Sequence, residues 1–439
     1  MSSPYRLLHI ADPHFSECHF LDGTPFDIGH RHAQELEEVL MQHERLRTAF
    51  DAIILSGDFS FVCRKSGFEA AAVFVERISR FVRAGGLLVL PGNHDIDLSK
   101  QVALGGLSLP TSKAEAEGPF REFLAAIAKY VGAPNHYLSR IIRIQGDGKP
   151  GLVLAGLNSC RVERYDARGW GYIGTDQIYD LYSKLFHGTR EAQAQEGDSV
   201  LAVTHHNLLP IWDVDLRVLF RPPEKRKFSF VMDAGGTLNF LSDLGISALL
   251  HGHTHVQSEK RVYGYGSGDR TEYRNLILGT GSLGIAKQRV ALPHHFRIIE
   301  IDERSFLQYE DFTADLCSPN TLRTWRKSKM TRPLPLMARW EADQVRKVLE
   351  MHNAAAHTGR FDSENLESWS LLRVKALYPN LWPGVFSGLC QRVRKIRPLA
   401  TDEAISSAVE SILERSPTDD QLRNFSLEQI VILRTMESE

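Results

Sequence analysis

Residues 86–95 read GLLVLPGNHD, an apolar run that stops at a proline and a glycine and gives way to an amide, an imidazole and a carboxylate. A short continuous apolar run of this kind is typical of a buried strand. The glycine lets the backbone turn sharply where the strand ends. On either side of this stretch the same design recurs, at Tyr5 to Phe15, Ala52 to Ser60, Ser199 to Asn207 and Ile246 to His255. The sequence therefore predicts five buried strands with polar side chains at their ends.

Helical patterns separate the early strands. Apolar positions recur at three- and four-residue spacing in His32 to Phe50 and in Gly67 to Ala84. An order of strand, helix and strand indicates an α/β fold. Four further strands are predicted, at Tyr137 to Ile144, Gly151 to Asn158, Tyr273 to Gly279 and Phe296 to Ile301. This number of strands favours two packed mixed β-sheets flanked by helices.

The composition is that of a folded chain with a sizeable core, since 43% of its 439 residues are hydrophobic and 24% are charged. No stretch has the features of a signal peptide or of a membrane span, so we expect a soluble cytoplasmic protein with no membrane contact. The five cysteines have no paired spacing, which disfavours a disulfide framework or a thiolate zinc site. A net charge of −2 gives no overall attraction to nucleic acid.

The character of the sequence changes near Thr313, where strand signals stop and helices broken by turns begin. We therefore predict an α/β domain over residues 1–312 and a mainly helical C-terminal accessory region over residues 313–439. A basic, proline-containing stretch at about 214–236, which includes RPPEKRK, is predicted to be an inserted loop.

The polar residues at the five strand ends are of the types that bind metals. Strand ends converge at one edge of an α/β sheet, so residues distant in sequence can meet there. Two aspartates, one asparagine and four histidines suit Mn, Fe or Zn better than an all-oxygen Mg²⁺ or Ca²⁺ site. Seven ligands are too many for one tetrahedral ion, so two metal ions are predicted.

At these residues the sequence resembles the calcineurin-like metallophosphoesterase family. The family pattern is Asp-x-His, Gly-Asp, Gly-Asn-His-Asp or Glu, a single or doubled His, and Gly-His-x-His, and all five blocks occur here in order. The resemblance covers roughly Tyr5 to Asp311 and implies a metallophosphoesterase-like α/β sandwich. It says nothing about the C-terminal region.

The resemblance also implies a role for each residue. Two sets of three ligands would each bind one metal, Asp12, His14 and His255 in one set and Asn93, His205 and His253 in the other. Asp58 would bridge the two metals. His94 would face the substrate and stabilise the transition state or protonate the leaving oxygen, with Asp95 orienting it. The doubled histidine leaves His206 as an alternative to His205, because Asn207 stands where the family often has a proline.

In motif form the sequence is most similar to the class III cyclic nucleotide phosphodiesterase group. This implies hydrolysis of a cyclic nucleotide or another nucleotide-type phosphodiester, in preference to a phosphomonoester. A hydroxide bridging two metals roughly 3.5–4 Å apart would attack phosphorus in line with the leaving oxygen.

Two alternatives remain at this point. Basic segments at Arg323 to Arg332 and Gln391 to Arg397, with tryptophans nearby, would suit a DNA or RNA nuclease of the SbcD-like type. A non-catalytic or regulatory module is the alternative from another class, in which the C-terminal region binds a protein partner or a second copy of the chain.

Overall fold

The computed structural model describes residues 3–314 with gaps at 16–24, 43–48, 61–62, 98–100, 105–106, 111–117, 132–138, 146–149, 161–170, 175–176, 179, 182–183, 186–192, 210–230, 232, 266–270 and 285–292. Beyond residue 314 it describes 325–327, 334–336 and parts of 386–435. Most of the predicted basic loop at 214–236 therefore lies outside the described residues.

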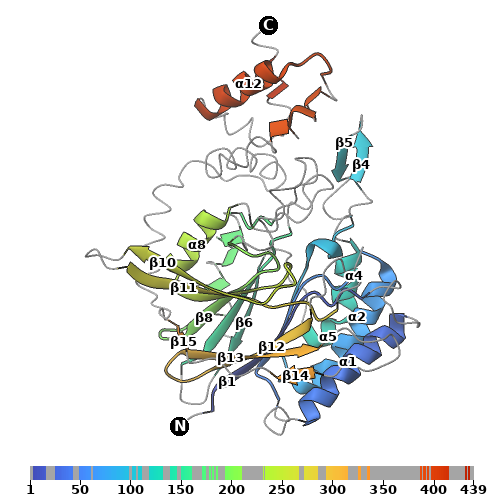
Figure 1. Ribbon diagram of the computed structural model, residues 1–439, viewed down its shortest axis with the longest axis vertical. Helices are drawn as coiled ribbons and strands as arrows, with labels where there is room; N and C mark the ends of the chain where they lie inside the picture. Colours follow the sequence, from blue (N-terminus) through green and yellow to red (C-terminus); the bar gives the residue numbers. More distant parts are fainter. Residues whose placement is uncertain are drawn as a thin grey trace.

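The first sheet has seven strands built around the N-terminal strand (Figure 1). β1 (Tyr5–Ile10), β2 (Ala52–Ser56) and β3 (Leu87–Leu90) run parallel to one another. On its other side β1 pairs antiparallel with β12 (His294–Ile301), which pairs with β13 (Phe306–Ala314). Two short strands, β14 (Trp325–Lys327) and β15 (Leu334–Pro335), pair with β13. The sheet thus joins segments from both ends of the first 335 residues.

The second sheet has six strands in the order β10-β11-β9-β8-β7-β6. Its centre is parallel and its two edges are antiparallel. The strands are β6 (Ser139–Ile144), β7 (Leu152–Leu157), β8 (Ser199–Val203), β9 (Ile246–His251), β10 (Ser258–Tyr265) and β11 (Thr271–Gly279). A separate two-stranded hairpin joins β4 (Gln101–Leu104) and β5 (Leu107–Pro110).

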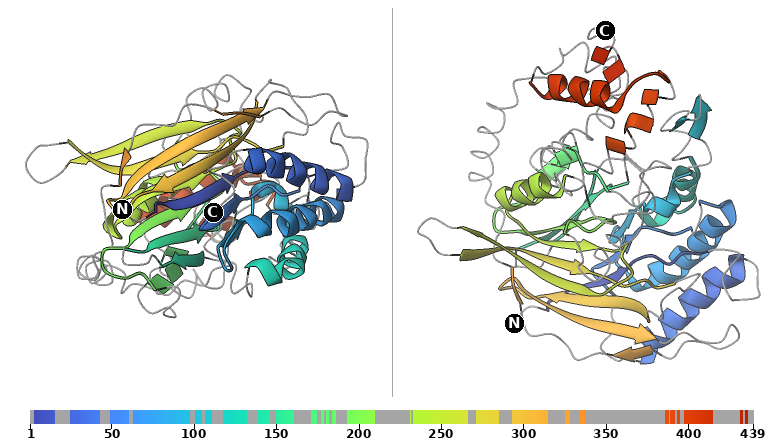
Figure 2. Two further views of the ribbon diagram at one scale, coloured as in Figure 1. Left: turned by 90° about the horizontal axis from the view of Figure 1, so that it is seen from below. Right: turned by 45° about the horizontal axis from the view of Figure 1, so that its top comes forward.

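The two sheets pack face to face, and helices cover their outer faces (Figure 2). Aliphatic side chains fill the space between the sheets, including Leu7, Ile54, Leu154 and Leu250, all of them 1% exposed or less. The outer face of the first sheet is covered by α1 (Pro25–Gln42), α2 (Lys65–Ile78), which continues into a short 3-10 turn η2 (Ser79–Phe81), α4 (Gly118–Ala126) and α5 (Ala128–Val131). That of the second sheet is covered by α8 (Ala234–Asp243). The predicted class, two mixed sheets flanked by helices, is confirmed.

The last described helix, α12 (Asp402–Glu414), packs with neighbouring helical turns around an apolar core of its own. This core includes Leu389, Val393, Ile405 and Val409, each fully buried. No described helix is long and apolar enough to cross a membrane.

The expectation that strands stop near Thr313 is wrong, because β13 runs to Ala314 and β14 and β15 extend the same sheet. Residues 325–327 have no alternating pattern long enough to predict a strand, and they are ordered by pairing with β13 and by packing of Trp325 on Phe296, with ring centroids 4.8 Å apart. The predicted first helix is also displaced, since α1 begins at Pro25 and ends at Gln42.

Candidate metal centre

The five predicted polar clusters meet at one edge of the sandwich. Asp12 and His14 follow β1, Asp58 follows β2, and Asn93 and His94 lie in a short turn, η3 (Asn93–Asp95), after β3. In the second sheet His205 follows β8, and His253 and His255 follow β9. Because β1, β2 and β3 are parallel, and β8 and β9 are parallel, their carboxyl ends lie on the same side of each sheet.

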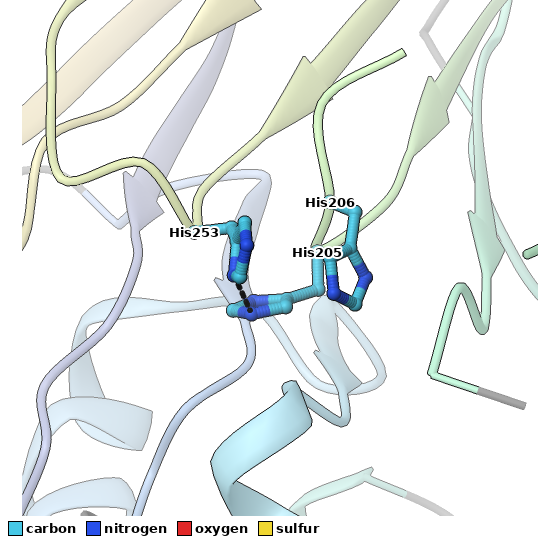
Figure 3. A group of neighbouring side chains, drawn as sticks. All are labelled: His205, His206 and His253. Carbon is cyan, nitrogen blue, oxygen red and sulfur yellow. Dashed lines mark hydrogen bonds between the residues drawn. The ribbon is translucent and has the colours of Figure 1, made fainter. Parts of the chain in front are cut away.

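The side chains form two groups in which every potential ligand atom lies within 4.8 Å of the others. One group is Asp12, His14, Asp58 and His255, and the Nε2 atoms of its two histidines are 2.9 Å apart. The second is His205, His206 and His253 (Figure 3), in which His205 Nε2 lies 3.1 Å from His253 Nδ1. Asn93 belongs beside the second group, because its Oδ1 lies 3.0 Å from His205 Nε2.

Asp58 lies between the two groups. Its Oδ1 is 3.4 Å from His205 Nε2 and its Oδ2 is 3.7 Å from His14 Nε2. The carboxylate thus directs one oxygen to the histidines of each group. Because Asp58 is only 1% exposed, it has almost no access to bulk water.

Five of these residues adopt a left-handed backbone conformation that residues other than glycine rarely adopt. The φ angles are 50° for Asp12, 46° for His14, 57° for Asp58, 68° for His253 and 58° for His255. Such conformations cost on the order of 1–3 kcal/mol each and persist where the surroundings impose them. They turn the chain at each strand end, so that these side chains face the centre of the site.

Two glycines permit the close approach of these turns. Gly57 has a φ of 91°, and a Cβ there would lie 2.5 Å from the backbone nitrogen of Gly92 and 2.6 Å from His205 Nδ1. A Cβ on Gly92 would overlap the Asp58 carboxylate. The Gly-Asp block therefore needs its glycine for both space and conformation, and the Gly-Asn-His-Asp block needs its glycine for space.

Burial favours the neutral form of three of the imidazoles, those of His205, His253 and His255. Desolvation lowers the pKa of His205 and holds that of His253 well below its usual value, and it lowers the pKa of His255 to about 4. Burial raises the pKa of Asp12, and the nearby Asp58 carboxylate raises it further. Neutral imidazoles are the form that binds metals, and a bound cation favours the ionised form of a carboxylate. The donor set therefore fits metal ions.

The two adjacent histidines differ in their hydrogen bonds. His205 Nδ1 lies 2.8 Å from the carbonyl oxygen of Ser56, so Nδ1 carries the proton and Nε2 offers its lone pair to the site. For His206, the Ser159 hydroxyl oxygen accepts the backbone N–H at 3.0 Å and lies 2.9 Å from Nδ1. Ser159 thus holds both the backbone and the ring of His206, through Nδ1, whereas His205 is held by a carbonyl oxygen that can only accept.

His94 and Asp95 occupy different positions. His94 is partly exposed, its backbone N–H donates to Asp58 Oδ1 at 2.8 Å, and its ring meets the His14 ring edge-on at 5.2 Å. Asp95 is fully buried and accepts the backbone N–H groups of Ser60 and Gly92 at 2.9 and 2.8 Å. Asp95 thus ties together the loops that carry Asp58 and Asn93.

Sequence reasoning missed one segment of the site, Thr280 to Gly284, which follows β11 and contacts the backbone of Asp12. The glycine-rich run GTGSLG at 279–284 is the signal that could have indicated a close backbone approach. His9 is a hydrogen-bonded core histidine, because its ring lies 2.9 Å from Ser56 Oγ and 2.6 Å from Thr280 Oγ1.

The chain belongs to the calcineurin-like phosphoesterase family, whose sequence profile matches residues 5–257. Members of the family are metallophosphoesterases that use divalent metal ions. A search of curated proteins found no match.

Solved structures with a similar backbone include PhoD, at 9% identity and a TM-score of 0.39 over 81% of this chain and 77% of PhoD. A 5'-nucleotidase precursor from Thermus thermophilus is 13% identical, with a TM-score of 0.31 over 81% of this chain and 59% of that one. A metallophosphoesterase from Sphaerobacter thermophilus is also 13% identical, with a TM-score of 0.27 over 79% of this chain and 94% of that one.

Proposed function

We propose that this protein is a binuclear metal-dependent phosphodiesterase that hydrolyses a cyclic nucleotide or another nucleotide-type phosphodiester. The observation that carries the binuclear part is the position of Asp58, which directs one carboxylate oxygen toward each group of histidines. The preference for a diester rests on the form of the Gly-Asn-His-Asp and Gly-His-Thr-His blocks.

Two metal ions would be held by two sets of side chains that share Asp58. Asp12, His14 and His255 form the first set, and Asn93, His205 and His253 form the second. His205 is favoured over His206 as the ligand, because the Ser56 carbonyl holds the Nδ1 proton and leaves Nε2 facing Asn93 and His253. This nitrogen and oxygen set suits Mn, Fe or Zn.

When bound, the two metals would supply a nucleophile from water at neutral pH and neutralise the charge of the phosphate. The other functions, which are substrate access, proton donation and positioning, would belong to residues of the chain. His253, His255 and His94 are the partly exposed members of the site, so a substrate reaches the centre from their side. His94 is the group that would donate a proton or a hydrogen bond to the leaving oxygen. Asp95 would position His94 indirectly, by holding the loop that carries it.

The test is hydrolysis of bis(p-nitrophenyl) phosphate against p-nitrophenyl phosphate by Mn²⁺-loaded protein, with Asp58→Asn as the control. Faster cleavage of the diester, lost in the variant, is the expected result. Preference for the monoester would contradict the proposed diester specificity and would leave the binuclear site intact.

Among the residues that the structure describes in the C-terminal basic segments, several cations are paired within the chain, which does not favour a nuclease. Arg394 donates to Asp402 and to the Ala400 carbonyl, and Arg397 donates to Thr435. Lys327 lies 2.9 Å from Glu310 on β13. These cations bind within the chain. A steep loss of nucleic acid affinity with rising salt would be the sign of nuclease-type contacts.

We retain the division into a catalytic domain at 1–312 and an accessory region at 313–439 as a proposal. The separate apolar core around α12 supports it, whereas β14 and β15 tie the first part of that region to the catalytic sheet. Partner binding or self-association is the function we propose for the part around α12. Size-exclusion chromatography of full-length protein and of protein ending after residue 336 would test it.

A further inference from the structure

The segment from Thr280 to Gly284 lies beyond the residues that match the family profile, yet it binds the backbone of a proposed metal ligand. Ser282 Oγ donates to the Asp12 carbonyl oxygen at 2.6 Å, and the Gly284 N–H donates to the same oxygen at 3.2 Å. The Leu283 N–H donates to the Ala11 carbonyl oxygen at 2.9 Å. Three donors of one segment therefore hold the two residues at the end of β1.

Asp12 is thus held from three sides. Its N–H donates to the Gly57 carbonyl oxygen at 3.1 Å, and its carbonyl oxygen accepts from Ser282 and Gly284. Its carboxylate accepts the His253 N–H, at 2.9 Å to the nearer oxygen. These bonds impose the left-handed φ of 50° on Asp12 and aim its carboxylate at His255, whose Nε2 is 3.7 Å away.

A buried network fixes the segment in turn. The Gly281 N–H donates to His295 Nδ1 at 2.9 Å, and the His295 N–H donates to the Ser282 carbonyl oxygen at 2.8 Å. Because Nδ1 accepts, the His295 proton is on Nε2, which donates to Asp311 at 2.8 Å. Arg297 also binds Asp311, through two nitrogens, and both His295 and Arg297 are 1% exposed. The two bonds of His295 to the segment, with its third bond to Asp311, hold the segment in this conformation.

We propose that Ser282 is a positioning residue for one of the two metals: by fixing the backbone of Asp12, it sets the affinity of the group that contains Asp12, His14 and His255. The inference rests on the proposed binuclear centre. It assigns to Ser282 a larger effect on one metal than on the other, because this segment holds Asp12 directly, whereas the side chains of Asn93 and His205 contact Ser56, His253 and each other. Partners that orient ligands in this way typically contribute 10- to 100-fold to metal affinity.

The test is Mn²⁺ titration of metal-stripped, full-length protein by isothermal titration calorimetry. The binding step that belongs to the Asp12 group is identified as the step that His255→Ala removes. In Ser282→Ala we expect this step to weaken by about 10-fold or more, while the other step stays within about 3-fold of its original value.

Two further variants make the comparison specific. Ser282→Thr keeps the hydroxyl donor, and we expect it to retain the affinity of the Asp12 group. Ser199→Ala is a matched control, because Ser199 is a buried serine with one side-chain hydrogen bond, 2.9 Å to Ser305, at the opposite end of β8 from His205. It should leave both binding steps unchanged.

Equal weakening of both steps in Ser282→Ala would show a general loss of structure and would overturn the inference. So would unchanged binding, or a loss in Ser282→Thr as large as that in Ser282→Ala. In each of these cases the unsubstituted protein still binds two Mn²⁺ ions, and the proposed function stands. Absence of Mn²⁺ binding in the unsubstituted protein would remove the proposed function and the inference together.

Discussion

Substitution of Gly57 by alanine should weaken metal binding without unfolding the protein. A Cβ at this position would lie 2.5 Å from Gly92 N, 2.6 Å from Gly92 Cα and 2.6 Å from His205 Nδ1. Ordinary contacts of a Cβ begin at 3.4 Å, so the Gly92 loop and the His205 ring would have to move by nearly 1 Å. Neither is the free end of a flexible side chain, because Gly92 contributes backbone atoms and His205 is held by Ser56.

Two costs are expected and can be separated. The left-handed φ of 91° adds strain of about 1–2 kcal/mol for any side chain at Gly57. The collision adds about 1–3 kcal/mol, as is typical of overpacking. Gly85→Ala is the matched control, since Gly85 has a φ of 78° and its Cβ would meet no atom within 4 Å. It carries the strain without the collision.

The assay combines urea unfolding with metal analysis after dialysis. We expect Gly57→Ala to be less stable than Gly85→Ala by about 1–3 kcal/mol and to bind metal about 10- to 100-fold more weakly. Diester hydrolysis should fall with metal content. Normal metal content and turnover in Gly57→Ala would refute the close approach of the Gly57 backbone to Gly92 and to the His205 ring on which the site depends.

Three further predictions concern single groups. Asp58→Asn should weaken both metals together, because Asp58 contacts both groups, and metal analysis that finds two ions in an active variant would contradict this. His94→Ala should keep its metals and lose on the order of 10²- to 10⁴-fold in turnover, most of all on substrates with poor leaving groups; equal turnover on such substrates would exclude His94 from the reaction. His9 gives a pH dependence: burial, with the charge of Arg297, holds its pKa well below 6.5 in the folded state, so the unfolded state binds more protons below that pH. The contribution of the neutral His9 to the free energy of unfolding is therefore complete above about pH 6.5 and falls on acidification by up to about 1.4 kcal/mol per pH unit. Urea unfolding of His9→Gln should show a shallower loss of stability with falling pH.

The sequence predicts the five site strands correctly because their signal is local. An apolar run such as LLVL at 87–90, followed by a glycine turn, is recognisable without its neighbours. The meeting of Asp12, Asp58 and Asn93 also follows from the sequence, since parallel strands bring their carboxyl ends to one edge, and the same rule brings His205 and His253 together in the second sheet. The ligand set is thus accessible from local patterns and one rule of topology.

Other features depend on contacts that a local pattern does not contain. β13 has the sequence FLQYEDFTA, in which charged residues lie among buried ones, so its pattern does not clearly predict a strand. Asp311 can lie in this strand because Arg297 and His295 bind its carboxylate. The support of Asp12 by Ser282 uses a backbone carbonyl, so no side-chain motif marks it. The choice between His205 and His206 likewise needs their hydrogen-bond partners, Ser56 and Ser159.

The position of β12 beside β1 has a consequence for the order in which the chain folds during synthesis. β1 can pair with β2 once both strands have been made, but its other edge stays unpaired until β12 has been synthesised, roughly 240 residues after β2. Synthesis of that length takes on the order of 10–50 s on a ribosome. An exposed strand edge is a site of mispairing with other chains. We therefore expect the nascent chain to be prone to mispairing until residue 301 emerges, and a fragment that ends at residue 257, where the family match stops, to aggregate more than the full-length chain.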